Sequence, residues 1–128
     1  MRINPDCVRT ILLFCESTLN NHNIVRFGSD FGHLNELFTG DELQYTSKKM
    51  IEGKLLEGRS ISNVQTEINE ITWEGHKLLD NIRDDFAWKT VLEKTQKLES
   101  VSISVLSRIA QQTVLDIINN KEQDDSVK

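Results

Sequence analysis

Apolar residues recur at helical spacing through the first twenty positions of the chain. A start signal precedes them, because Asn4 is a good N-cap, Pro5 fits the first helical position, and Asp6 complements the positive end of the helix dipole. A turn-forming cluster at 20–23 ends the pattern. The sequence therefore predicts a core-facing helix that begins at Pro5. Its apolar stripe consists of Val8, Ile11, Leu12, Cys15 and Leu19.

Shorter elements follow this helix. Residues 24–27 predict a short strand, and the glycine-containing segment 28–32 predicts a loop. Leu34, Leu37 and Phe38 are spaced to anchor one short helix, interrupted at positions 39–40.

The hydrophobic period changes near the middle of the chain. We expect a longer helix with Ser47 as its N-cap, ending at about Glu57 with Gly58 as its stop. Beyond it, apolar and polar residues alternate, which favours two short strands joined by a tight polar loop around positions 65–66. The apolar positions of this hairpin are Ile61, Val64, Ile68 and Ile71.

Helical spacing returns after the hairpin. Thr72 is the expected cap of the next helix, with Leu79, Ile82 and Phe86 on one face. A bend at 84–85 separates this helix from a continuation that carries Trp88, Val91, Thr95 and Leu98. We expect both Trp73 and Trp88 to be buried and to hold these helices on the core.

Ser100 or Ser102 caps a last helix with a 3-4-3-4 apolar stripe. Two interpretations stay open: this face packs on the first helix and closes the core, or it forms a homodimer interface. Residues 120–128 are polar and predict a flexible tail. The candidate dimer face consists of Ile103, Leu106, Ala110, Thr113 and Ile117.

The predicted order is helix, strand, short helix, helix, two-stranded ribbon, then further helices. This order is typical of the winged helix, a variant of the helix-turn-helix. Gly75, three residues after Thr72, would let the following helix pack closely on the ribbon. The expected fold class is therefore α+β and mostly helical, with a winged-helix-like core, a small β-ribbon as the wing, and extra C-terminal helices. We expect a single domain over 1–119, of which about 84–119 is a helical extension.

Composition narrows the class of protein. The 128 residues are 38% hydrophobic and 27% charged with one proline, values that are ordinary for a globular domain. The formal charge of −5 works against a strong grip on nucleic acid phosphates. Cys7 and Cys15 would lie about 12 Å apart on one helix, too far to form a disulfide with each other. Two unpaired thiols, no signal peptide and no long apolar run predict a cytoplasmic protein without a membrane segment.

Two longer motifs resemble one family. The segment Asn4–Leu13 reads NPDCVRTILL and Ile71–Arg83 reads ITWEGHKLLDNIR, and Trp88 with Lys89 follows soon after. These segments resemble a family catalogued as domain of unknown function 2513, found mainly in Gram-positive bacteria, their phages and prophages. The resemblance implies a winged-helix fold and a phage or prophage origin, but no reaction and no ligand. The chain departs from the family pattern at positions 51–52 and 59–62, so a contact with a shared partner would be lost or changed here.

No catalytic constellation, cofactor motif or metal-ligand spacing emerges from the sequence. Major-groove readers need Arg, Lys, Asn or Gln aimed at base edges, whereas the third helix mixes basic and acidic residues and the wing carries Glu67 and Glu70. We therefore expect a non-enzymatic accessory protein of a phage or prophage that binds another protein, such as a host or defence component. A dimeric DNA-binding regulator is the alternative. The candidate residues for contact with a protein partner or DNA are Lys48, Lys49, Glu52, Leu56 and Arg59.

Overall fold

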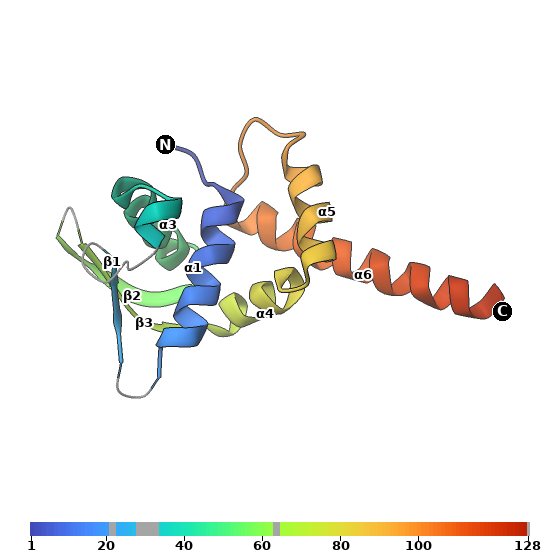
Figure 1. Cartoon of the computed structure of the whole chain (residues 1–128), viewed down its shortest axis with the longest axis horizontal. Coiled ribbons are helices and arrows are strands. Elements are labelled where there is room, and N and C mark those ends of the chain that lie inside the picture. The colour runs from blue at the N-terminus through green and yellow to red at the C-terminus, as the bar shows by residue number, and fades with distance from the viewer. Residues whose placement is uncertain (21–22, 28–33, 63–64, 128) are drawn as a thin grey trace.

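The computed structural model describes residues 1–20, 23–27, 34–62 and 65–127, and it is an α+β structure in which helices predominate (Figure 1). The fold class expected from the sequence is confirmed at this level. One hydrophobic core runs from Cys7 to Ala110. The elements are α1 (Pro5–Thr18), β1 (Val25–Phe27), α2 (Leu34–Leu37), α3 (Gly40–Glu52), β2 (Leu56–Ser62), β3 (Gln65–Ile71), α4 (Trp73–Ile82), α5 (Asp85–Thr95) and α6 (Ile103–Val127).

The first helix forms as its sequence predicts. The Asn4 side chain accepts a hydrogen bond from the backbone N–H of Asp6 at 3.0 Å, and Pro5 is the first helical residue. Four of its five predicted apolar positions are buried, and Leu19, just past the helix end, packs against the core half-buried. Strand β1 and the short helix α2 also form where they are expected. The loop predicted at 28–32 lies outside the described residues.

The three strands form one antiparallel sheet in the order β1-β3-β2. The hairpin is confirmed, but its strands are longer than expected, and Gln65 and Thr66 are the first residues of β3 rather than a loop. Ile61 is exposed, whereas Ile68 is fully buried. Val64 lies outside the described residues.

The helix predicted at 47–57 is misplaced. Helix α3 begins at Gly40, where the Thr39 side chain accepts from the N–H of Glu42 at 3.1 Å, and it ends at Glu52. Ser47 lies in its middle and is buried, with its hydroxyl donating to the carbonyl of Gln44 at 3.0 Å. Lys54 takes a left-handed backbone conformation with φ of 69°, which turns the chain into β2 before it reaches Glu57.

Gly58 is not a helix stop. It lies in β2, where a Cβ atom would stand 2.1 Å from the carbonyl oxygen of Glu67 on β3. The register between the two strands also shifts at Glu57 and Gly58. A glycine at this point therefore lets the two strands approach each other across an irregularity.

The junction between the sheet and α4 forms as expected. The Thr72 hydroxyl accepts from the N–H of Gly75 at 3.0 Å and caps α4. A Cβ on Gly75 would stand 2.1 Å from the carbonyl oxygen of Leu55, so only glycine fits at this crossing. The expectation that Trp73 is buried is wrong, because this residue is 75% exposed, whereas Trp88 is 6% exposed as predicted.

The chain bends between α4 and α5 where the sequence predicts it. Asp84 accepts from the N–H of Ala87 at 2.9 Å and caps α5. Because α5 is a new helix, Phe86 does not share the buried face of Leu79 and Ile82, and it is 65% exposed. Leu98 lies beyond the end of α5 and is also exposed.

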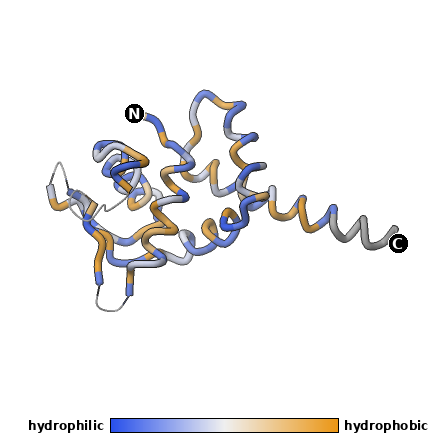
Figure 2. The backbone as a smooth tube through the Cα atoms, in the orientation of Figure 1, coloured by the Kyte–Doolittle hydropathy of each residue, from blue (hydrophilic) through white to orange (hydrophobic). Residues whose placement is uncertain are grey.

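Helix α6 begins after Ser102, whose hydroxyl accepts from the N–H of Val105 at 3.2 Å. It continues to Val127, past the predicted helix end at 119, so its helical backbone replaces much of the expected tail. The first half of α6 contacts α4 and α5, and the second half extends away from the rest of the molecule (Figure 1). Hydrophobic positions continue along α6 as it leaves the body (Figure 2).

Candidate functional site

One of the five predicted contact residues is buried. Lys48, Lys49 and Glu52 lie on α3 as expected. Leu56 is the first residue of β2 and is only 1% exposed, so the prediction that it contacts a partner is wrong. The cause is the early end of α3, which moves Leu56 from the exposed face of a predicted helix into the sheet.

Three basic residues in and beside the sheet are paired with neighbouring carboxylates. Lys49 lies 3.0 Å from Glu52, and this hydrogen bond raises the pKa of the lysine. Arg59 and Arg26 flank Glu67, with Nε–O distances of 3.4 and 3.3 Å. Both arginines stand opposite Glu67 in the strand register, one from each side of the central strand β3. Glu67 therefore reduces the positive potential that β1 and β2 could offer to phosphates.

The predicted dimer face is mostly used inside the chain. Leu106 and Ala110 are fully buried and Thr113 is 1% exposed, in the part of α6 that packs on α4 and α5. The Thr113 hydroxyl also accepts a hydrogen bond from Lys94 at 2.9 Å. Ile103 lies against Gly53 at the start of α6. The first of the two open interpretations therefore holds in a changed form: the stripe closes the core, but on α4 and α5 instead of α1.

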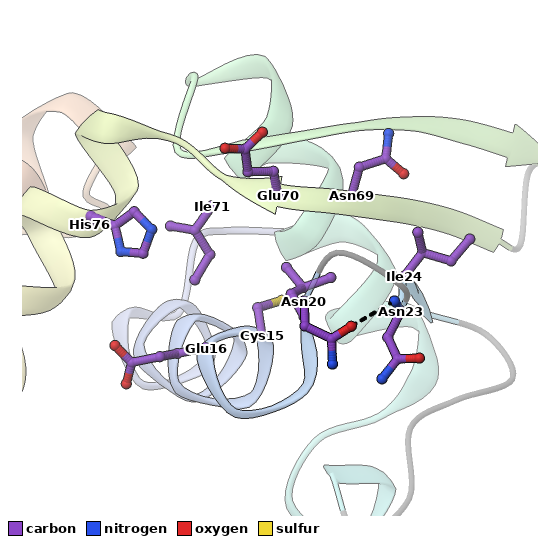
Figure 3. A pocket seen from close by; sticks show the side chains of 10 residues that line it. Cys15, Glu16, Asn20, Asn23, Ile24, Asn69, Glu70, Ile71 and His76 are labelled. Atoms are coloured by element: carbon purple, nitrogen blue, oxygen red, sulfur yellow. Dashed lines mark hydrogen bonds between the residues drawn. The ribbon is translucent and has the colours of Figure 1, made fainter.

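A cleft of about 510 Å³ lies between α1, β3 and the start of α4 (Figure 3). Glu16, Glu70 and His76 come to it from these three elements, together with amide side chains. Arg83 donates two 2.6 Å hydrogen bonds to Glu16 and holds the pKa of that carboxyl below its ordinary value. The carboxylate of Glu16 is therefore occupied by a partner from the end of α4.

The two thiols of the chain, one of which borders this cleft, are not nucleophiles at neutral pH. Cys15 borders the cleft and is fully buried, and burial raises the pKa of its thiol to about 12. Burial likewise raises the pKa of Cys7 to about 11. Both thiols are free and stay protonated at neutral pH, whereas the thiolate is the reactive form. The two cysteines thus behave as small core residues.

A second hollow, which we call the α6 groove, lies between the α4–α5 corner and the middle of α6. Its volume is about 430 Å³, and most of its lining is apolar. Phe86 at its edge is 65% exposed and Ile118 is 47% exposed. Among the described residues that line it, two are carboxylates and none is basic. The lining consists of Asp80, Asn81, Asp84, Phe86, Ala87, Val114, Ile117 and Ile118.

Helix α1 fixes the corner that forms one wall of this groove. Arg9 donates to the carbonyl oxygens of Ile82 and Arg83, each at 2.9 Å, and to the carboxylate of Asp85 at 3.0 Å. These carbonyls belong to the end of α4, where intrahelical partners are missing. Arg9 therefore holds the turn that carries Asp84 and Phe86 in place.

Trp88 joins the same cluster. Its indole N–H donates to Asp6 at 3.0 Å, and the Arg9 guanidinium lies 5.5 Å from the ring centroid. The two sequence motifs singled out above, at 4–13 and 71–83, thus meet with Trp88 in space. The contacts that Asp6 and Arg9 make with Trp88 and with the end of α4 hold α1 against the α4–α5 corner.

The comparison with known families covers both of these motifs. The family model described as hypothetical protein DUF2513 matches residues 2–102. The chain belongs to this family. An uncharacterized protein of Haemophilus influenzae is 29% identical over 126 residues, which cover 92% of this chain and 99% of that relative. No solved structure matches the chain.

The DUF2513 match ends at position 102, immediately before α6 begins. One wall of the α6 groove, formed by Asp80, Asp84 and Phe86, lies inside the matched region. The other wall, formed by Val114, Ile117 and Ile118, lies outside it. The groove is therefore built by the family body together with a helix that the family model does not include.

The sequence did not single out the groove, although signals for its residues exist. Phe86 lies in the first turn of a new helix that Asp84 caps, so the side of the helix on which it lies depends on its position relative to Asp84. Trp73 shares a helical stripe with Lys77 and Asp80, which are both exposed. Counting from the caps would have placed both aromatic side chains at the surface.

Two further findings bear on the chemistry. Within the described parts of the chain, no three His, Cys, Asp or Glu side chains gather closely enough to hold a metal ion. Over the same residues, none of the helices combines the length and apolar character needed to cross a bilayer.

Proposed function

We propose that this DUF2513 protein is a non-enzymatic, protein-binding module whose docking surface is the α6 groove. The observation that carries the proposal is the pair Phe86 and Ile118, two large apolar side chains exposed on opposite walls of one hollow. Aromatic anchors beside a pocket are typical of the centres of protein interfaces.

The scaffold for this surface has the element order of a winged helix. Helix α1, strand β1, helices α2 and α3, and the hairpin β2–β3 follow one another in that order. This order supports the winged-helix interpretation of the family body, with α5 and α6 as additions. Three further points stay predictions: that the protein functions for a phage or prophage, that it acts on a host or defence component, and that it is cytoplasmic.

A DNA-binding regulator is the alternative, and the exposed Lys48 on α3 favours it. The ion pairs of Lys49 with Glu52, and of Arg59 with Glu67, weigh against it. A dimeric regulator would also need a face other than the buried part of α6. Retention of genomic DNA fragments that weakens steeply with salt would support this alternative.

Site-specific crosslinking tests the protein-binding proposal. A photoreactive phenylalanine analogue at position 86, introduced in the source cells, should give one discrete protein adduct. The same analogue at Leu37, which is 61% exposed on α2, serves as the control and should not give that adduct. The purified partner should then bind the wild-type chain but not the Phe86→Ala variant. Equal adducts from both positions, or none from position 86, would overturn the proposal.

A further inference from the structure

We propose that the α6 groove binds a basic amphipathic helix of a partner protein, with apolar side chains in the hollow and Lys or Arg side chains against its rim. This inference rests on the proposed function, and it adds the chemical class of the partner. It follows from the distribution of charge and apolar surface around the groove.

The rim of the groove is acidic. Asp80 and Asp84 line it, and the side chain of Asp80 is 73% exposed. Asp80 lies 3.5 Å from Arg83, a long contact, whereas Arg83 makes its short hydrogen bonds to Glu16 on α1. The described lining contains no basic side chain, although Lys77 lies in the adjoining hollow that shares Asp80 and Val114 with the groove. A cationic segment seated in the groove itself would therefore lie against the two carboxylates.

The apolar side chains on the two walls of the groove suit apolar anchors. Val114, Ile117 and Ile118 share one face of α6, and Phe86 stands opposite them on the first turn of α5. A volume of about 430 Å³ lies in the range of pockets that bind small ligands, so the groove is large enough to receive side chains of a partner. Anchors at positions i, i+3 or i+4, and i+7 of a helix would lie along such a trough.

A second copy of this chain does not fit the groove equally well. The chain carries a net charge of −5, and the sequence after Ile118 includes Glu122, Asp124 and Asp125. An α6 helix from a second copy would therefore bring carboxylates toward Asp80 and Asp84. Charge complementarity instead selects a basic segment from another protein.

The test uses synthetic helical peptides on the full chain. Three peptides share leucines at one helical spacing and differ in their polar face, which is Lys, Gln or Glu. Fluorescence anisotropy measures the affinity of each peptide, and backbone amide NMR spectra show which residues of the chain each peptide perturbs. We expect the Lys peptide to bind at least tenfold more tightly than the Glu peptide, with the Gln peptide between them. The perturbed signals should belong to Asp80, Phe86, Val114 and Ile118.

Variants locate the interaction. Asp80→Asn should lower the affinity for the Lys peptide several-fold and leave the affinity for the Gln peptide unchanged. Ile118→Ala should lower the affinity for both peptides. Asp84 is left intact because it caps α5. Leu37→Ala removes an exposed apolar side chain elsewhere, 61% exposed against 47% for Ile118, and should change the affinity of neither peptide.

Three results would overturn the inference: no binding of the Lys peptide at millimolar concentration, equal affinity for the Lys and Glu peptides, or binding that Ile118→Ala leaves unchanged. Self-association lost in Ile118→Ala would assign the groove to a second copy instead. If the position-86 crosslink captures a partner whose bound segment is neutral or acidic, the proposed function stands and this inference fails.

Discussion

Trp73 and Trp88 are the same residue type on consecutive helices, and they lie in opposite environments. Trp88 is enclosed between α1 and the α4–α5 corner, with its N–H on Asp6 and Arg9 against its ring. Trp73 is the first residue of α4 and lies on the exposed stripe of that helix. Burial of one and exposure of the other follow from helix phase and not from residue type.

The two tryptophans therefore give a paired prediction. Trp88→Ala should lower the free energy of unfolding by about 3–5 kcal/mol, because it leaves a cavity and removes the partner of Asp6. Trp73→Ala should change it by no more than about 0.5 kcal/mol, as surface substitutions usually do. Urea unfolding followed by circular dichroism measures both. Equal losses would contradict the environments described for the two side chains.

Gly75 and Gly40 form a second pair. Gly75→Ala should destabilise the protein by about 1–3 kcal/mol, because the new methyl group would overlap the carbonyl oxygen of Leu55. Gly40→Ala should be neutral or stabilise by up to about 1 kcal/mol, since nothing lies within 4 Å of its Cβ position and alanine favours helices. Thermal melting of the two variants compares them, and a tolerated Gly75→Ala would show that α4 can move away from the sheet.

The buried thiols predict a loss of stability at high pH. An unfolded thiol has a pKa near 9, whereas the folded values are about 11 for Cys7 and about 12 for Cys15. The stabilisation from the neutral thiols is therefore complete below pH 9 and falls as the pH rises toward 11 and 12. Urea midpoints from pH 8 to 11 should fall less steeply in Cys15→Ala than in the wild type. If the urea midpoints of the two proteins fell equally steeply with pH, ionisation of the Cys15 thiol would not be the cause of the loss of stability.

At the scale of elements, a helix start could be predicted from the sequence where a recognisable N-cap residue precedes an apolar stripe. Helices α1 and α4 were predicted at their true starts because Asn4 and Thr72 precede clear apolar stripes. Helix α3 was misplaced because Thr39 with Gly40 resembled an interruption. Two positions of its buried face are the polar Thr46 and Ser47, so apolar periodicity alone does not reveal it.

The correction of α3 has its own test. Thr39→Ala should cost about 0.5–2 kcal/mol, because it removes the acceptor for the N–H of Glu42. Ser47→Ala should have a much smaller effect, since its hydroxyl bonds only within the helix and alanine is the better helix former. Equal losses in urea unfolding would show that the cap at Thr39 contributes little.

The candidate site was harder to predict than the elements. The α6 groove joins residues 80–87 with residues 114–118, which approach only after α6 has folded back on α4 and α5. Helical spacing indicated the inward stripe of α6 correctly, but it could not say which helices that stripe would cover. The ion pairs of Glu67 depend on strand register, which the misplaced hairpin loop obscured.

At the scale of the whole molecule, α6 is part of the core although it lies outside the DUF2513 match. A chain that ends at Ser102 loses Ala110 and Leu106, and removal of a buried leucine side chain alone costs about 2–5 kcal/mol. Such a loss is comparable with a total stability of about 5–15 kcal/mol, so this chain should not fold cooperatively. A chain that ends at Asn120 should melt as the full chain does. Circular dichroism melting compares the two, and a cooperative transition in the shorter chain would contradict the role of α6.

Helix α6 completes the core with one part of its inward stripe and borders the groove with the next part of the same stripe. Its inward positions, Leu106 and Ala110, are fixed by the core that they complete, whereas Val114, Ile117 and Ile118 border the groove beyond that core. Substitutions at these outer positions would reshape one wall of the groove and leave the body of the protein unchanged. The specificity for a partner can therefore change during evolution without loss of folding, through substitutions confined to residues 114–118.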